Sequence, residues 1–135
     1  MATLNPYLSF EENASEAMKF YQSCLGGELR IMTVGESPMA ASMPKEFQAS
    51  VMHASLETGK IRIMASDTLG KSRLQRGNDV SLMLLCESEA ELRDIFAKLS
   101  AGGTVTTPVR KEFWGALYAD FADRFGVKWM LNFEK

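Results

Sequence analysis

The sequence contains an internal repeat, and this repeat limits the folds that the chain can adopt. A shift of 76 residues places the double glycine Gly26-Gly27 on Gly102-Gly103. The same shift aligns further apolar positions: Leu4 with Val80, Phe10 with Cys86, Ala14 with Ala90, Phe20 with Phe96 and Leu29 with Val105. Self-similarity at a fixed offset is typical of a supersecondary unit that occurs twice. The alternative is that two unrelated strand–helix segments share this pattern by chance.

Hydrophobic periodicity predicts the same order of elements, β-α-β-β-β, in both copies. Alternating or continuous apolar runs predict four strands in each copy: 4–10, 28–34, 50–57 and 60–66 in the first, and 80–86, 104–109, 116–121 and 127–133 in the second. The expected organisation is therefore a single α+β domain made of two βαβββ modules, at about residues 1–68 and 78–135. Gly35–Glu46 and Thr68–Asn78 are interpreted as mobile loops.

One helix is predicted in each copy from apolar residues at helical spacing. In the first copy the helix begins near Ala14, and Asn13 or Ser15 is expected to cap its free N–H groups. In the second copy Ser88 and Glu91, three positions apart, are typical of a capping box. Glycine is expected to end both helices, because glycine tolerates the left-handed turn that follows a helix.

Strand alternation separates an apolar face from a mixed face on each predicted sheet. In the last strand Trp129 and Leu131 belong to the apolar face, and Met130 belongs to the mixed one. The same rule assigns these residues to the mixed face: Tyr7, Ser9, Arg62, Met64, Ser66, Tyr118, Asp120, Lys128 and Asn132, together with His53, which it groups with Val51 and Ser55. Because ligand cavities combine apolar walls with a few polar groups, we expect curved mixed sheets around a cavity lined by this face.

Composition and charge exclude several partners. The formal net charge is −2, which does not suit a nucleic-acid footprint or a polybasic membrane anchor. No apolar run is long enough to cross a bilayer, and Met1–Phe10 lacks the charged start of a signal peptide. Cys24 and Cys86 match no metal or redox spacing. We therefore expect a reduced, cytoplasmic protein that binds neither nucleic acid nor membrane.

Familiar catalytic and cofactor motifs do not occur in the sequence. There is no G-x-G-x-x-G after a strand, so neither a dinucleotide site nor an S-adenosylmethionine site of the Rossmann type is indicated. There is no P-loop and no G-x-S-x-G, and a single histidine does not support a nucleophile triad.

The candidate catalytic residues are His53 and Asp120. His53 has the only side chain with an ordinary pKa near neutrality, so it is the natural general base. A carboxylate such as Asp120 or Glu57 is expected to act with it. The other interpretation of His53 is a strand histidine that hydrogen-bonds its neighbours.

The candidate ligand-binding residues share the mixed face or the loop before a strand: Tyr7, Ser9, Arg62, Met64, Phe113, Trp114, Tyr118 and Met130. Tyrosines supply a hydrogen-bonding hydroxyl and a stacking ring, and Arg62 suits an anionic group. Methionines such as Met64 and Met130 form adaptable apolar walls. Phe113-Trp114-Gly115 predicts either a pocket wall or a β-bulge with both rings in the core.

The chain resembles the vicinal oxygen chelate superfamily (glyoxalase, bleomycin-resistance and extradiol-dioxygenase relatives), and more narrowly its PhnB-like branch. The resemblance is carried by several stretches that occur in the right order along nearly the whole chain. The stretches are Asn5–Phe10, Ala17–Gly27, Val51–Ala54, Ile63–Asp67, Gly102-Gly103, Phe113–Ala116 and Asp123–Met130. The most specific pieces are F-Y-x-x-x-L-G-G and D-x-F-G-V-x-W. The resemblance implies paired βαβββ modules and a homodimer.

The sequence departs from this superfamily at its metal-binding positions. The resemblance implies His, Gln or Glu ligands on the first and last strands of each module. These positions fall at about Asn5 and Ser81, and near Met64 and Met130. Asparagine and serine are poor ligands, and thioether sulfur does not suit Mg²⁺, Mn²⁺ or Fe²⁺. No metal and no other cofactor is therefore expected.

Three functions follow from these residues. The first is a metal-free protein that binds an aromatic or amphipathic small molecule without turning it over. The second is a glyoxalase-type lyase, isomerase or dioxygenase that uses His53 as acid, base or ligand. The third is a structural dimer with a vestigial cavity.

Overall fold

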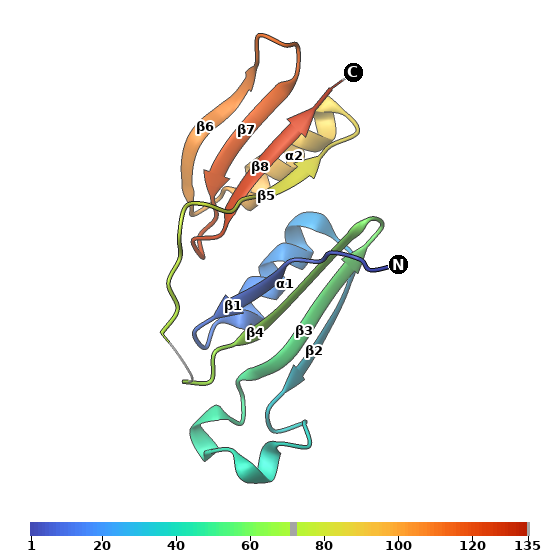
Figure 1. Cartoon of the computed structure of the whole chain (residues 1–135). Coiled ribbons are helices and arrows are strands. Elements are labelled where there is room, and N and C mark those ends of the chain that lie inside the picture. The colour runs from blue at the N-terminus through green and yellow to red at the C-terminus, as the bar shows by residue number, and fades with distance from the viewer. Residues whose placement is uncertain (71–72, 135) are drawn as a thin grey trace. The chain divides into compact units, whose positions relative to one another are not determined.

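The computed structural model describes residues 1–70 and 73–134 (Figure 1). It divides into two compact units, Met1–Gln75 and Arg76–Lys135, each described by itself below. In the described residues no helix combines the length and apolar character that a membrane span requires.

The first unit is one four-stranded sheet with one long helix. Its elements are β1 (Tyr7–Phe10), α1 (Ala14–Leu25), β2 (Glu28–Thr33), the 3₁₀ turns η1 (Ala40–Ser42) and η2 (Lys45–Phe47), β3 (Val51–Thr58) and β4 (Ile61–Asp67). The strand order is β1-β4-β3-β2, with β1 and β4 parallel and the other neighbours antiparallel. Helix α1 packs on β2, β3 and β4.

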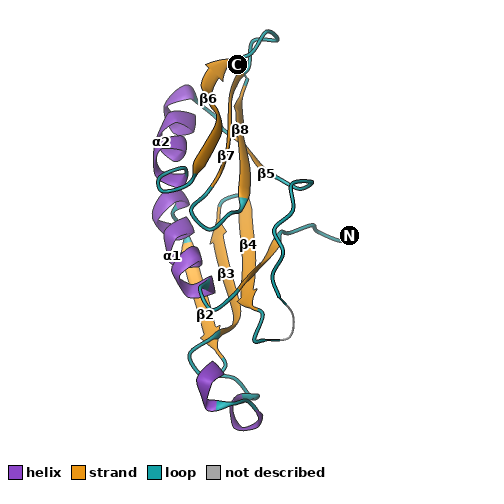
Figure 2. Ribbon diagram, turned by 90° about the vertical axis from the view of Figure 1, so that its left-hand side faces the viewer, coloured by secondary structure: helices purple, strands orange, loops and turns teal. Residues whose placement is uncertain are grey.

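The second unit repeats this topology. Its elements are β5 (Leu82–Leu85), α2 (Glu89–Leu99), β6 (Thr104–Lys111), β7 (Leu117–Ala122) and β8 (Lys128–Phe133). The strand order is β5-β8-β7-β6, again with one parallel pair, β5 and β8. Figure 2 shows that the helix of each unit covers one face of its own sheet. The predicted α+β class and the β-α-β-β-β order of elements are confirmed.

The first strand of each unit is shorter than predicted. Strand β1 begins at Tyr7 and β5 at Leu82, whereas the alternation predicted starts at residues 4 and 80. Leu4 and Val80 are exposed, at 98% and 69%. The pattern was misleading because an apolar residue just outside a strand continues the alternation without packing on anything.

The repeated double glycine has the same structural cause in both units. The first glycine of each pair has a positive φ, 77° at Gly26 and 79° at Gly102. Glycine ends α1 as predicted, since Gly26 is its C-cap, but the C-cap of α2 is Ser100, two residues before Gly102. The second glycine of each pair packs against the neighbouring strand. A Cβ at Gly27 would collide with the Glu57 carbonyl oxygen, and one at Gly103 with the Ala122 carbonyl oxygen. Glycine is therefore required for two different reasons within each pair.

The segment between β2 and β3 is more ordered than predicted. It was expected to be a mobile loop, but it contains η1 and η2. The Gln48 side-chain amide donates to the carbonyl oxygens of Ala40 and Met43, at 2.9 and 3.1 Å. The second predicted loop, 68–78, has no helix or strand in 68–70 and 73–78. Residues 71 and 72 lie outside the described part.

The two helices begin in different ways. At α2 the predicted Ser88 cap is confirmed, because Ser88 Oγ accepts from the Glu91 amide at 3.0 Å. The return bond of the capping box is shifted by one residue, since Glu91 Oε1 accepts from the Glu87 amide, at 2.8 Å. At α1 the predicted cap is wrong, since the Asn13 side chain makes no capping hydrogen bond. Asp67 Oδ1, at the end of β4, instead accepts from the Ala14 amide at 3.0 Å.

This difference predicts unequal effects of two alanine substitutions. Ser88→Ala removes a capping acceptor and should lower the free energy of unfolding by about 1 kcal/mol. Asn13→Ala removes a side chain with no capping bond, so we expect a change below about 0.5 kcal/mol. Urea denaturation followed by circular dichroism measures both. Equal losses in the two variants would contradict this assignment of the caps.

A β-bulge near the start of β3 changes which residues share a face. Met32 pairs with His53, but Thr33 pairs with Val51, so Met52 is the extra residue. Val51 consequently lies in the core at 1% exposure, beside Ala54 and Leu56. His53 belongs to the opposite, mixed face. The predicted grouping of His53 with Val51 is therefore wrong, whereas its grouping with Ser55 is confirmed.

Candidate functional site

The candidate site residues lie on the faces that the helices leave uncovered. In β8 the core side chains are Trp129 and Leu131, at 1% and 0% exposure, and the half-buried Met130 and Asn132 lie on the other face. In β4 the same alternation buries Ile63 and leaves Arg62 and Met64 on the mixed face. The predicted division into an apolar face and a mixed face is confirmed for these strands.

The strand register makes positions in the two units equivalent. Three equivalent pairs are Tyr7 and Met83, Met64 and Met130, and Ser55 and Asp120. His53 and Tyr118 lie two residues before Ser55 and Asp120, so they are equivalent as well. The two mixed faces therefore have different side chains at equivalent positions of the same fold.

On the first sheet Tyr7 and His53 form a contact. The Tyr7 hydroxyl lies 3.2 Å from His53 Nδ1, and the ring centroids are 5.8 Å apart. Strand β4 separates β1 from β3, so the Tyr7 side chain reaches across that strand. Tyr7 is 49% exposed. His53 thus has a hydrogen-bond partner on its own sheet, which is compatible with either interpretation of this histidine.

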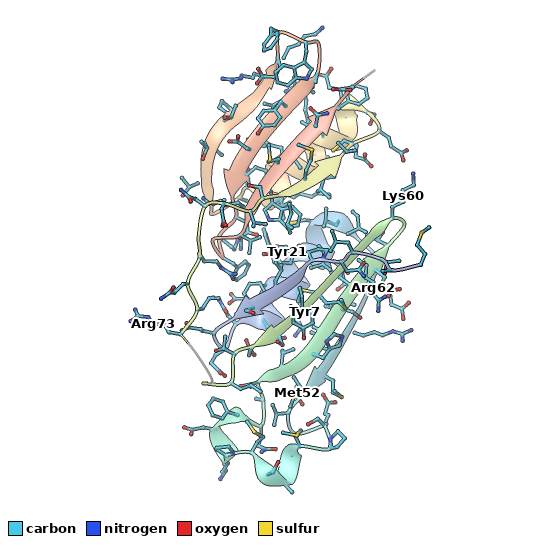
Figure 3. All side chains as sticks on the ribbon, viewed as in Figure 1. Tyr7, Tyr21, Met52, Lys60, Arg62 and Arg73 are labelled. Carbon is cyan, nitrogen blue, oxygen red and sulfur yellow. The ribbon has the colours of Figure 1, made fainter. Side chains whose placement is uncertain are left out.

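The other predicted residues of the first sheet have separate surroundings. Figure 3 labels Tyr7 and Arg62 over this sheet. Arg62 Nε lies 3.1 Å from Glu57 Oε1, and both side chains are at least half exposed. Glu57 therefore pairs with Arg62 and not with His53. Met64 pairs in register with Tyr7, and Ser9 lies two residues further along β1 on the same face.

On the second sheet the mixed face forms a depression of about 600 Å³ that is largely open to solvent, called the cavity below. It is lined by Met83, Thr107, Arg110, Glu112, Trp114, Tyr118, Asp120, Met130, Asn132 and Glu134. Four of these were predicted as site residues: Trp114, Tyr118, Asp120 and Met130. The volume lies within the range of about 300–1,000 Å³ that is usual for small-molecule sites.

Tyr118 and Asp120 are the central polar pair of this cavity. The Tyr118 hydroxyl donates to Asp120 Oδ2 at 2.8 Å. Asp120 Oδ1 is buried and accepts no hydrogen bond within the described residues. A buried carboxylate oxygen without a donor is unusual in a folded protein. The Asp120 carboxylate therefore has one oxygen that no described residue satisfies.

Sequence reasoning missed a second polar pair in the cavity. Arg110 Nε donates to Glu112 Oε1 at 2.8 Å, and the Glu112 side chain is only 12% exposed. Alternation did not place these residues, because the predicted strand ended at residue 109, whereas β6 runs to Lys111. The β6–β7 register also shifts twice, between Val105 and Thr107 and between Thr107 and Arg110. Where strand pairing is irregular, alternation along the sequence cannot assign a residue to one face of the sheet.

The aromatic pair before β7 does not lie in the core. Phe113 is 96% exposed and Trp114 53% exposed, and their rings meet edge to face with centroids 4.9 Å apart. The predicted core alternative is therefore wrong. Gly115 follows with a φ of 97°, in a region that disfavours other residues. Trp114 lines the cavity, but Phe113 is not among the lining residues.

The Tyr118 hydroxyl resists ionisation. Burial raises its pKa to about 12, and the hydrogen bond to Asp120 and the charge of that carboxylate act in the same direction. An unfolded tyrosine ionises near pH 10. Because the folded-state pKa is the higher one, neutral Tyr118 stabilises the fold below about pH 10, and this contribution is lost as the pH rises through about 12.

A tyrosinate titration tests this shift. The absorbance difference between the wild type and Tyr118→Phe should titrate with a midpoint near pH 12. In Asp120→Asn the midpoint should fall toward the ordinary value, because the carboxylate is gone. A midpoint near pH 10 for the wild-type difference, as expected for an unperturbed phenol, would contradict this account.

The residues present do not suit the divalent metal that the resemblance implies. The predicted ligand positions Asn5 and Ser81 lie before β1 and β5, outside the strands. Met64 and Met130 offer thioether sulfur, which is a soft donor. Within residues 1–70 and 73–134, no three His, Cys, Asp or Glu side chains are grouped to hold an ion.

Comparison with known proteins gives a family and a fold. The sequence profile of the family described as 3-demethylubiquinone-9 3-methyltransferase matches residues 2–132. The crystal structure of protein PA1353 from Pseudomonas aeruginosa is similar over 99% of this chain and 98% of its own, with 36% identity and a TM-score of 0.89. The PhnB protein from Bacillus cereus is similar over 98% and 100%, with 24% identity and a TM-score of 0.78.

A protein with lower sequence identity to this chain has a similar fold. A glyoxalase/bleomycin resistance protein/dioxygenase family enzyme from Burkholderia phytofirmans is similar over 94% of both chains, with a TM-score of 0.63. Its sequence identity to this chain is 15%, so the likeness concerns the fold alone.

Proposed function

The chain belongs to the family described as 3-demethylubiquinone-9 3-methyltransferase, and we propose that it is a metal-free small-molecule binding protein of the PhnB-like branch of the vicinal oxygen chelate superfamily. The ligand is an aromatic or amphipathic compound that is held without being turned over. The proposal includes assembly as a homodimer. The family's description names a methyl transfer. The sequence has no G-x-G-x-x-G, so it gives no indication of an S-adenosylmethionine site of the Rossmann type for such a reaction.

One observation carries this proposal, namely the cavity on the mixed face of the second sheet. Its walls combine thioethers and an indole with a hydrogen-bonded tyrosine–carboxylate pair. Apolar walls supply binding energy through burial, and a few polar groups fix orientation, which is the usual composition of a ligand site. Met83 and Met130 can adjust to the shape of a bulky ligand, because methionine side chains are flexible.

The second candidate is a glyoxalase-type lyase, isomerase or dioxygenase that uses His53. The observation that favours it is the Tyr7–His53 contact, since a hydrogen bond to one ring nitrogen can orient an acid–base histidine. Neither predicted carboxylate is given to His53 by the described contacts: Glu57 pairs with Arg62, and Asp120 accepts from Tyr118 in the second unit.

Elemental analysis and thermal shift separate these two functions. Protein purified without chelator should contain no stoichiometric metal, and aromatic compounds should raise the melting temperature of chelator-treated protein. Met130→Trp fills the cavity and should abolish the ligand-induced shift. Met32→Trp, on the first sheet and outside the cavity lining, is the matched control and should retain it. Stoichiometric Ni²⁺, Zn²⁺ or Mn²⁺ that is lost in His53→Ala would contradict metal-free binding.

A further inference from the structure

The cavity of the second sheet continues into a smaller depression on the same face. This second depression has a volume of about 220 Å³. It shares Asp120 and Met130 with the cavity, so the two spaces adjoin. We call it the polar depression, because its lining includes the side chains of Asn78, Ser81, Thr106 and Lys128.

The cavity and the polar depression form one groove that follows the strands. Along β8 the cavity is lined by Asn132 and Met130, and the polar depression by Met130 and Lys128. The lining of the other strands changes in the direction that the register requires: from Tyr118 to Asp120 on β7, from Thr107 to Thr106 on β6, and from Met83 to Ser81, just before β5. Lys128 and Asn132 are separated along β8 by about 13 Å, at roughly 3.3 Å per residue. The groove therefore suits an extended ligand that lies along β8.

The two ends of the groove differ in chemistry. The cavity end contains thioether and aromatic side chains on which an apolar body can pack. The polar end contains the amide of Asn78 and the hydroxyls of Ser81 and Thr106, all at exposed positions. None of these three side chains hydrogen-bonds another described residue, so their donors and acceptors are available to a ligand. Phe121 and Trp129 also line the polar end, but they are buried at 2% and 1% exposure.

The charges at the polar end of the groove balance. Among the described residues that line the polar depression, Lys128 is the one cation and Asp120 the one carboxylate. Asp120 pairs in register with Met130, and Lys128 lies two residues before Met130, so the opposite charges are diagonal neighbours on adjacent strands. Opposite charges in such cross-strand positions attract each other. Neither charge is left for an ionic ligand, and the remaining polar side chains suit an uncharged group.

We infer that the groove selects an amphipathic ligand with an aromatic body and an uncharged amide or hydroxyl head. This inference rests on the proposed function and names the ligand class of the same site. The body packs on Met83 and Met130, and the head exchanges hydrogen bonds with Asn78, Ser81 and Thr106. An ionic head is disfavoured, because an ion that leaves water without a partner loses more hydration than a neutral group.

Four probes with one naphthyl body test the preference for the head group: 2-naphthyloxyacetamide, 2-naphthyloxyacetate, 2-(2-naphthyloxy)ethylamine and 2-ethoxynaphthalene, which lacks a polar head. Fluorescence titration of each probe with the chelator-treated full chain measures the affinities. The dissociation constant of the acetamide should be about fivefold lower than that of 2-ethoxynaphthalene, as expected for net neutral hydrogen bonds. The acetate and the amine should both bind more weakly than the acetamide.

Removal of the hydroxyls at the polar end should abolish this preference. Ser81→Ala combined with Thr106→Val should raise the dissociation constant of the acetamide about fivefold and change that of 2-ethoxynaphthalene by less than about twofold. Both positions are exposed, so the fold should tolerate the changes. Thr104→Val is the matched control, since it removes an exposed hydroxyl of β6 outside the groove lining. It should leave all four affinities unchanged.

The outcomes distinguish the two levels of the proposal. If 2-ethoxynaphthalene or either ion binds as tightly as the acetamide, selection of an uncharged polar head is wrong, and small-molecule binding in the cavity stands. If the double variant weakens the acetamide and 2-ethoxynaphthalene equally, Ser81 and Thr106 shape the groove and do not recognise the head, so the inference is again wrong. If none of the four probes binds, the proposed function itself fails.

Discussion

Replacement of Asp123 by alanine is expected to lower the free energy of unfolding by about 4 kcal/mol, the largest loss that we predict for a single side chain. Asp123 is only 3% exposed. Its Oδ1 accepts from the amides of Phe125 and Val127, at 2.8 and 3.1 Å. Its Oδ2 accepts from Trp129 Nε1 at 2.8 Å. Because Val127 and Trp129 are buried, alanine would leave their donors unsatisfied away from water.

Urea denaturation followed by circular dichroism measures this loss, and two variants control it. Asp123→Asn keeps one oxygen acceptor but presents an amide to the turn or to the indole, so its loss should be intermediate. Trp129→Phe removes the indole donor, so combining it with Asp123→Ala should cost less than the sum of the single losses. A loss below about 1 kcal/mol for Asp123→Ala would show that the network contributes little.

Replacement of Asp67 by alanine is expected to cost about 3 kcal/mol in the first unit. Asp67 is 5% exposed and ends β4. Its Oδ1 accepts from the Ala14 amide at the start of α1, and its Oδ2 accepts from the Val51 amide at the start of β3, at 2.8 Å. One carboxylate therefore joins three elements. A negative charge at a helix N-terminus is also favoured by the helix dipole.

Urea denaturation and hydrogen exchange separate the parts of this effect. In Asp67→Ala the amide protons of Ala14 and Val51 should exchange faster than their neighbours. Asp94→Ala, an exposed helix aspartate that pairs with Lys98, serves as the surface control and should change the free energy of unfolding by less than about 0.5 kcal/mol. Equal stability of Asp67→Ala and Asp94→Ala would show that Asp67 is not the cap of α1.

The structure explains two sequence patterns whose physical cause was not visible in the sequence. The pattern D-x-F-G-V-x-W spans the groups that the Asp123 carboxylate joins, namely Phe125, Val127 and Trp129. Gly126 completes the turn with a φ of 86°. The double glycine likewise recurs because a positive φ and a close backbone contact recur. Local patterns of this kind were sufficient to predict the α+β class and the order of the elements.

Features that depend on distant or irregular pairing could not be predicted. The cap of α1 comes from Asp67, 53 residues beyond Ala14, whereas sequence reasoning searched only neighbouring positions. The bulge in β3 moved Val51 into the core, and two register shifts in β6 hid Arg110 and Glu112 from an argument based on alternation. Alternation assigned residues to the correct face where the strand pairing is regular, as at Met130.

The central claim is that a small molecule binds, without metal, in the cavity of the second sheet. An amide NMR titration of the chelator-treated, isotope-labelled full chain with 2-naphthyloxyacetamide addresses it most directly. Binding should perturb the amides of residues that line the cavity, including Met83, Tyr118, Asp120 and Met130. Perturbations confined to Tyr7 and His53, or seen only after a divalent metal is added, would contradict the claim.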